Sequence, residues 1–167
     1  MLLVGQIQGT ARVVNYAGLV RGKTQRIIKL ENAGQPHDEM IESVSSYIKG
    51  LRYGSDELKL VRLEDAAFQV KMNELNRYFD ELCKEILLVR EKGYENTNII
   101  EMSEPFFNIC DEATGLAEAY SQRKATALNR LEQIVFVDVG GLIIIIAIEL
   151  VKALRYAAQN RILQSKV

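Results

Sequence analysis

Apolar side chains recur at intervals of three and four residues along most of the chain, which is the spacing of one face of an α-helix. The clearest run stops just before Gly93. Such a run is typical of the buried seam of a helix in a bundle, and it therefore predicts a long amphipathic helix between residues 68 and 89. Its members are Phe68, Met72, Leu75, Phe79, Leu82, Ile86 and Val89.

Three further helices are expected. The first covers about residues 6–31, and the turn NAGQPH follows it. The second starts with Asp38 as a candidate N-cap and runs to about residue 53. The last starts with Ser103 as a candidate N-cap, tolerates Pro105 in its first turn, and continues with an apolar face through about residue 131. Short connectors between four helices predict an all-α fold, an antiparallel up-down-up-down four-helix bundle.

An apolar segment, IVFVDVGGLIIIIAIELVKALRY, occupies residues 134–156 and admits three interpretations. Its β-branched residues around Gly-Gly fit a β-hairpin. Its ten uncharged residues from 139 to 148 fit a buried helix of a soluble protein. Residues 134–154 also have the length of a transmembrane helix, although Asp138 and Glu149 would each be costly in hydrocarbon.

The spacing of those two carboxylates favours the membrane helix. Eleven residues make about three helical turns, so Asp138, Gly141, Ile145, Glu149 and Lys152 fall on one stripe that a partner helix can cover. The residues after this stripe contain basic side chains and no acid, as expected of a cytoplasmic flank. We therefore expect the last bundle helix to extend into a transmembrane helix over residues 134–154.

Composition limits the chemistry. The 167 residues contain 21 Lys and Arg against 22 Asp and Glu, so no basic surface for nucleic acid is predicted. Cys83 and Cys110 are too few for a zinc cluster, and His37 is the only histidine. We expect no metal, no cofactor and no enzymatic activity. The two cysteines are expected as small buried apolar residues, with a disulfide in an oxidising compartment as the alternative.

The stretch NYAGLVRGKTQR, residues 15–26, departs from the helical pattern because it places glycines where each costs about 1 kcal/mol relative to alanine. A glycine such as Gly18 lets a ligand or another helix approach the backbone. Arg21 can present a planar fork to a carboxylate, nitrate or phosphate, and Asn15 and Gln25 can add hydrogen bonds. The alternative is a simple crossing of two helices with the arginines in solvent.

This stretch resembles a motif in the first helix of bacterial transmembrane sensors. Its pattern, N-x-A-G-x-x-R-x-x-x-Q-R from Asn15, is similar to I-N-x-A-G-x-x-R-M-x-S-Q-R of nitrate/nitrite sensor kinases and of sensor domains related to type IV pilus chemoreceptors. A looser likeness to Firmicutes sensors that precede a diguanylate cyclase or histidine kinase domain extends over most of residues 9–133. The sequence departs from the motif at Gly22 and Lys23, which argues against nitrate itself.

The resemblance implies an organisation and a function. Residues 1–133 would form an extracytoplasmic sensor bundle, 134–154 the second transmembrane helix, and 155–167 the start of a cytoplasmic signalling linker in a bacterial cell membrane. The chain would form a homodimer that binds a small, anionic ligand between paired first helices. Arg21 would contact the ligand, with Gln25, Asn15 and Gly18 beside it, and a helix shift would reach a C-terminal output domain.

A second function belongs to another class. The chain could be a soluble helical interaction module that binds proteins and no small ligand, with residues 134–154 as a core segment. Solubility without detergent would favour this module, and partition into membranes would exclude it.

Overall fold

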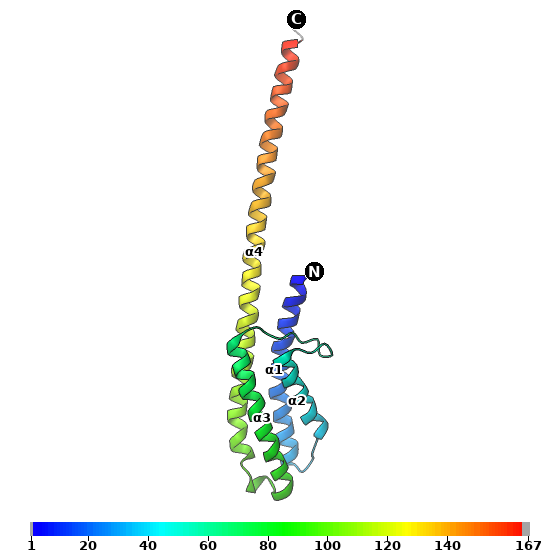
Figure 1. Ribbon diagram of the computed structural model, residues 1–167, viewed down its shortest axis with the longest axis vertical. Helices are drawn as coiled ribbons and strands as arrows, with labels where there is room; N and C mark the ends of the chain where they lie inside the picture. Colours follow the sequence, from blue (N-terminus) through cyan, green and yellow to red (C-terminus); the bar gives the residue numbers. More distant parts are fainter. Residues whose placement is uncertain (1, 165–167) are drawn as a thin grey trace. The chain divides into compact units, whose positions relative to one another are not determined.

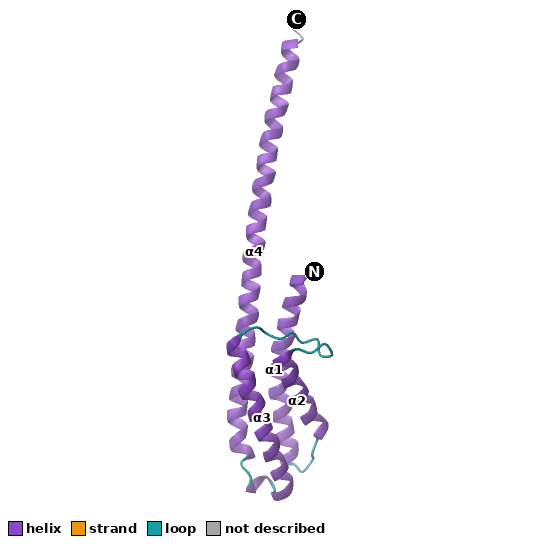
Figure 2. Ribbon diagram, viewed as in Figure 1, coloured by secondary structure: helices purple, strands orange, loops and turns teal. Residues whose placement is uncertain are grey.

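The computed structural model describes residues 2–164, and side chains within residues 9–157. Most of those residues are helical, and none of them belongs to a β-strand (Figures 1 and 2). The prediction of an all-α fold is confirmed, and α4 carries the apolar segment. The elements are α1 (Leu2–Asn32), α2 (Asp38–Tyr53), α3 (Ala66–Lys92), the 3₁₀ turn η1 (Tyr94–Asn96) and α4 (Ile99–Gln164).

The chain divides into two compact units, Met1–Lys124 and Ala125–Val167, and α4 contributes residues to both. The first unit holds the hydrophobic core, which draws side chains from α1, α2, α3 and the first part of α4. All seven apolar residues of the run predicted between 68 and 89 are buried in it. The helical periodicity therefore identified the core face of α3 correctly.

The core face of α1 follows the same helical spacing of three and four residues. Val13, Ala17, Val20, Thr24 and Ile27 are all buried. The hydroxyl of Thr24 has no hydrogen-bond partner within the described part of the chain. The opposite face of α1 is exposed, and it contains the glycines that break the pattern.

Helix boundaries differ from the prediction at two places. Asp38 is the first residue of α2, while His37 occupies the N-cap position without a side-chain cap. The fourth helix begins at Ile99, so Ser103 is not its N-cap and Pro105 lies inside the helix. The Ser103 hydroxyl donates instead to the carbonyl of Ile100 at 2.7 Å, because Ser103 already lies within the first turns. At the start of α4, the N–H of Met102 donates to the carbonyl of Asn98 at 2.9 Å.

The ends of α3 are set by local chemistry. The Asp65 carboxylate accepts a hydrogen bond from the N–H of Phe68 at 2.9 Å, which is an N-cap. Gly93 follows the helix with φ of 78°, a conformation that favours glycine. The expected end near Gly93 is therefore confirmed, whereas the cap at Asp65 was not predicted.

The connector between α2 and α3 packs against the core. Leu60 and Leu63 are buried, and paired backbone hydrogen bonds join Ser55 to Leu60. A Cβ on Gly50 would lie 2.9 Å from Leu60 Cδ1. A side chain at position 50 would therefore force the end of the Leu60 side chain to shift, and glycine avoids this crowding.

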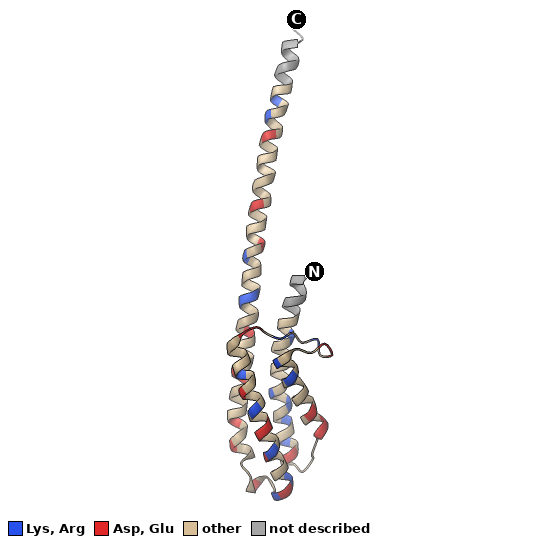
Figure 3. Ribbon diagram, viewed as in Figure 1, with Lys and Arg blue, Asp and Glu red and all other residues tan. Residues whose placement is uncertain are grey.

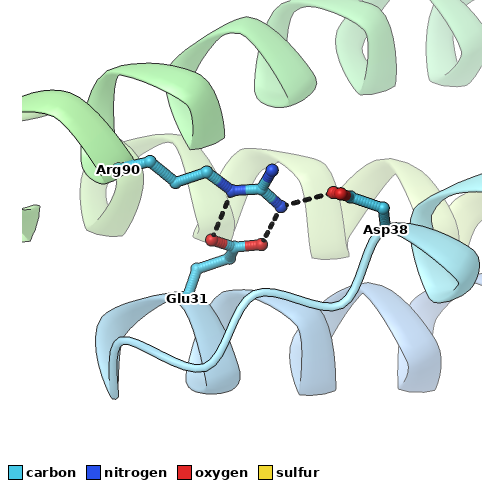
Figure 4. A network of polar contacts seen from close by, with 3 residues as sticks. All are labelled: Glu31, Asp38 and Arg90. Carbon is cyan, nitrogen blue, oxygen red and sulfur yellow. Dashed lines mark hydrogen bonds and ion pairs between the residues drawn. The ribbon is translucent and has the colours of Figure 1, made fainter.

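One arginine joins three helices of the first unit. Arg90 of α3 donates to both oxygens of Glu31 on α1, at 2.9 and 2.6 Å, and to Asp38 on α2 at 2.6 Å (Figure 4). The Glu31 side chain is 1% exposed, so its charge depends on this forked contact. The hydrogen bonds to Glu31 and Asp38 raise the pKa of Arg90.

The second unit consists of the later part of α4. Residues 134–156 are helical, so the β-hairpin interpretation is wrong. Apolar side chains along this segment are exposed, which the buried-core interpretation does not account for. Figure 3 shows few charges on this stretch, and by length and composition α4 is the one described helix that could cross a membrane.

Candidate functional site

The four predicted site residues lie on the solvent-facing side of α1. Asn15, Gly18, Arg21 and Gln25 are all exposed, at successive helical turns. The structure thus places them on one helix face. It does not bring them together around an enclosed cavity.

Arg21 meets a carboxylate of its own chain. Its Nε lies 3.2 Å from Oδ1 of Asp111 on α4. The side chains are 48% and 55% exposed, so solvent screens the pair and each group keeps hydrogen-bonding capacity toward a ligand. Arg21 therefore has a carboxylate of its own chain at one edge of its guanidinium.

The glycines of this face have open space around them. A Cβ placed on Gly18 or Gly22 would meet no other atom within 4 Å. Within the described chain, no helix or side chain uses the close approach that these glycines allow. If glycine is required at these positions, the group that requires it is a ligand or a second polypeptide.

An open depression lies along α1 around Asn15. Tyr16 within it packs edge-on against Tyr47 of α2, with ring centroids 4.8 Å apart, and the ammonium of Lys23 lies 5.0 Å from the centre of the Tyr47 ring. The Tyr16 ring, which lines the depression, is thus supported from behind by Tyr47. Its lining residues are Ala11, Arg12, Asn15, Tyr16 and Leu19.

Charge differs between the two helices that meet at Arg21. The exposed positions of α1 between residues 9 and 32 include basic side chains and no acid, because Glu31 is buried against Arg90. The part of α4 in the first unit exposes mainly carboxylates up to residue 122. The α1 surface suits an anion electrostatically. No cluster of three metal-ligating side chains occurs among the described residues.

Both cysteines are free. Burial raises the pKa of Cys83 to about 11 and that of Cys110 to about 12, with smaller effects of Asp80 and Asp111 in the same direction. Thiols in such surroundings are largely protonated at neutral pH and react slowly. The structure agrees with the expectation of small buried residues, although Cys83 is only half-buried beside an open groove between α2 and α3.

No protein-family model, curated protein or solved structure matches this sequence.

Sequence reasoning missed the carboxylate that faces Arg21 and the residues around Asn15. Asp111 lies 90 positions from Arg21 in the chain, and no local pattern joins them. Arg12 and Tyr16 carried a weak signal, since each lies three or fewer residues from Asn15. Only the packing of α1 beside α2 identifies Tyr16 as part of a surface.

Proposed function

We propose that this chain is the ligand-sensing part of a bacterial membrane receptor. It acts as a homodimer, binds a small anionic ligand near Arg21 at the interface between two copies, and passes a helix shift to a C-terminal output domain such as a diguanylate cyclase or histidine kinase. The sensor bundle lies outside the cytoplasm, and residues 134–154 cross the membrane. It has no catalytic activity of its own.

The observation that carries this proposal is an exposed face on α1 that combines open glycines with Arg21, in a chain whose α4 is apolar enough to cross a membrane. The motif around Asn15 and Arg21 adds its resemblance to sensor first helices. A basic face without neighbouring acids on its own helix favours an anion as the ligand.

The antiparallel bundle is part of this proposal. Thr10 Oγ1 lies 3.1 Å from Ser121 Oγ, and Arg21 contacts Asp111, so rising numbers on α1 meet falling numbers on α4. This order supports an up-down arrangement in which the bundle's first and last helices are neighbours. A ligand at Arg21 would then act directly on α4.

The mechanism is a shift between two dimer packings. A ligand that binds one packing more tightly than the other moves the equilibrium by that difference in affinity. A displacement of α4 by an ångström or two is the scale of helix shifts in switching proteins. The Arg21–Asp111 contact, being exposed, can exchange its carboxylate for the ligand without a large loss of stability.

The experiment is thermal unfolding of the full chain in detergent with a panel of small anions and carboxylate metabolites. A ligand at a hundred times its Kd should stabilise the wild-type protein by about 2.7 kcal/mol, which is several degrees in Tm. Arg21→Ala should lose this shift. Arg26→Ala, a change at another exposed arginine of α1, should keep it.

Equal shifts in wild type and Arg21→Ala would move the binding site away from α1. Absence of any shift across the panel would favour the second candidate, a helical protein-interaction module. That candidate keeps the open α1 face as a protein-binding surface, and it requires α4 to be covered in solution.

A further inference from the structure

Two matching stripes of exposed residues run along neighbouring helices of the first unit. Each follows steps of four, three, four, three and four residues, which is the seam spacing of packed helices. Every member is solvent-exposed. The α1 stripe is Ala11, Asn15, Gly18, Gly22, Gln25 and Lys29, and the α4 stripe is Glu104, Asn108, Asp111, Gly115, Glu118 and Gln122.

Both stripes have an open glycine near their middle. A Cβ on Gly115 would meet nothing within 4 Å, as at Gly18 and Gly22. Helix-interior glycines each cost about 1 kcal/mol relative to alanine, and this chain's own packing gives no reason for these three. A close helix–helix approach from outside would use them.

The two stripes carry complementary charge. The α1 stripe has a lysine and no acid, and Arg21 flanks it. The α4 stripe has three carboxylates and no base. Pairing α1 with a second α1 would oppose cations, and pairing α4 with a second α4 would oppose carboxylates. Pairing α1 with α4 removes both repulsions.

The contacts within one copy fix the levels of the two stripes. Arg21 lies beside Asp111, and Thr10 lies beside Ser121. Gly18 is three residues from Arg21 toward Thr10, and Gly115 is four residues from Asp111 toward Ser121, so the two glycines lie at nearly the same level.

The same register brings opposite charges to one level further along the helices. Lys29 lies eight residues from Arg21, and Glu104 lies seven residues from Asp111, both in the direction away from the Thr10–Ser121 contact. Lysine and glutamate therefore share a level, as Gly18 and Gly115 do. Asn15 likewise falls close to the level of Glu118.

We propose that two copies of this chain pack face to face through these stripes, with α1 of each copy against α4 of the other. The two-fold axis runs along the helices, so equal levels meet. Gly18 then faces Gly115 of the other copy, Lys29 faces Glu104, and the two Arg21–Asp111 pairs meet at the centre. This inference rests on the homodimer of the proposed function, and it specifies which helices form its interface.

The test uses full-length chain in native membranes with two differently tagged copies, one carrying Gly18→Cys and the other Gly115→Cys. Neither change meets an atom of its own chain, so both variants should fold. The native thiols are buried or half-buried with raised pKa values and should oxidise slowly. A disulfide needs Cα atoms about 4.4–6.8 Å apart, so only a close crossing will join the copies.

We expect the Gly18→Cys and Gly115→Cys copies to form a mixed disulfide several-fold faster than two Gly18→Cys copies. Gly18→Cys paired with Val70→Cys, an exposed position on α3, is the matched control and should stay unlinked. Preferential linking of two Gly18→Cys copies would overturn the proposal in favour of paired first helices. Absence of every cross-link would overturn it as well.

Charge reversal gives an independent readout. Lys29→Glu in the Gly18→Cys copy should lower the yield of the mixed disulfide several-fold, and Glu104→Lys in the other copy should restore it. If neither change alters the yield, the proposed register of α1 against α4 is contradicted. Cross-linking without any anion-induced Tm shift would leave the interface standing and remove the sensing role, so the two proposals fail separately.

Discussion

At the scale of single residues, the buried carboxylate of Glu31, close to the turn between α1 and α2, needs a partner that compensates its charge. Glu31 is almost fully enclosed and receives both hydrogen bonds of the Arg90 fork. Removing one member of such a pair leaves an uncompensated charge in a medium of low dielectric. Asp38 contacts the same guanidinium from an exposed position, so its share of the stabilisation is small.

Arg90→Met should therefore lower the free energy of unfolding by about 3 kcal/mol, because the buried Glu31 carboxylate loses its ion pair with Arg90. Unfolding of the full chain in detergent, followed by circular dichroism, measures the change. Asp38→Asn is the matched control and should cost less than about 1 kcal/mol. Equal losses in the two variants would show that the Glu31 contact is not the principal one.

At the scale of elements, periodicity predicted the α3 face and most of α1, because burial of one helix face repeats every three to four residues. The boundaries of the helices were predicted less accurately. Serine is a common N-cap residue, but Ser103 lies inside α4. The helix begins at Ile99, which is buried against the core. Contacts such as Glu31–Arg90 join residues 59 positions apart, and a single sequence contains no signal for them.

The connector contact at Gly50 gives a prediction at this scale. Gly50→Ala should destabilise the protein by about 1–3 kcal/mol, because the new methyl group would overlap Leu60 and crowd Leu58 and Ser55. Ser46→Ala, at an exposed position of the same helix, is the matched control and should change the free energy of unfolding by less than about 0.5 kcal/mol. Chemical denaturation in detergent compares the two, and equal effects in both would contradict the packing at Gly50.

The candidate site was predictable only in part. Asn15, Gly18, Arg21 and Gln25 fall close together on one side of α1 because a helix fixes which positions share a side, and the structure shows that this side is exposed. It could not supply Asp111, since that neighbour depends on how α4 packs beside α1.

At the scale of the whole molecule, the two units have opposite relations to solvent. The first unit encloses most of its large apolar side chains, whereas the apolar side chains of α4 between residues 134 and 157 are exposed. In water, an exposed apolar run of this length would favour association with other molecules. The hydrocarbon core of a membrane would bury it.

Ile144→Arg should accordingly weaken membrane insertion by roughly 2.5–3.5 kcal/mol, because it places a charge near the centre of the apolar run. The fraction of full-length chain that resists alkaline extraction from membranes measures this. Val70→Arg, a change at an exposed residue of α3, should leave the fraction unchanged. Complete extraction of the wild-type chain would contradict a spanning helix.

The contacts of Arg90 also make the turn between α1 and α2 a suitable position for inserting a label. Arg90 binds Glu31 before the turn and Asp38 at its end, while residues 33–37 are exposed and the N–H groups of residues 33–35 donate to carbonyls at the end of α1. Both ends of the turn are fixed by side chains outside it, so its own side chains can change, except at Gly34, whose φ of 69° favours glycine. A short epitope or a fluorophore-binding peptide inserted between Gln35 and Pro36 would report on the protein in living cells without touching the core or α1's exposed face.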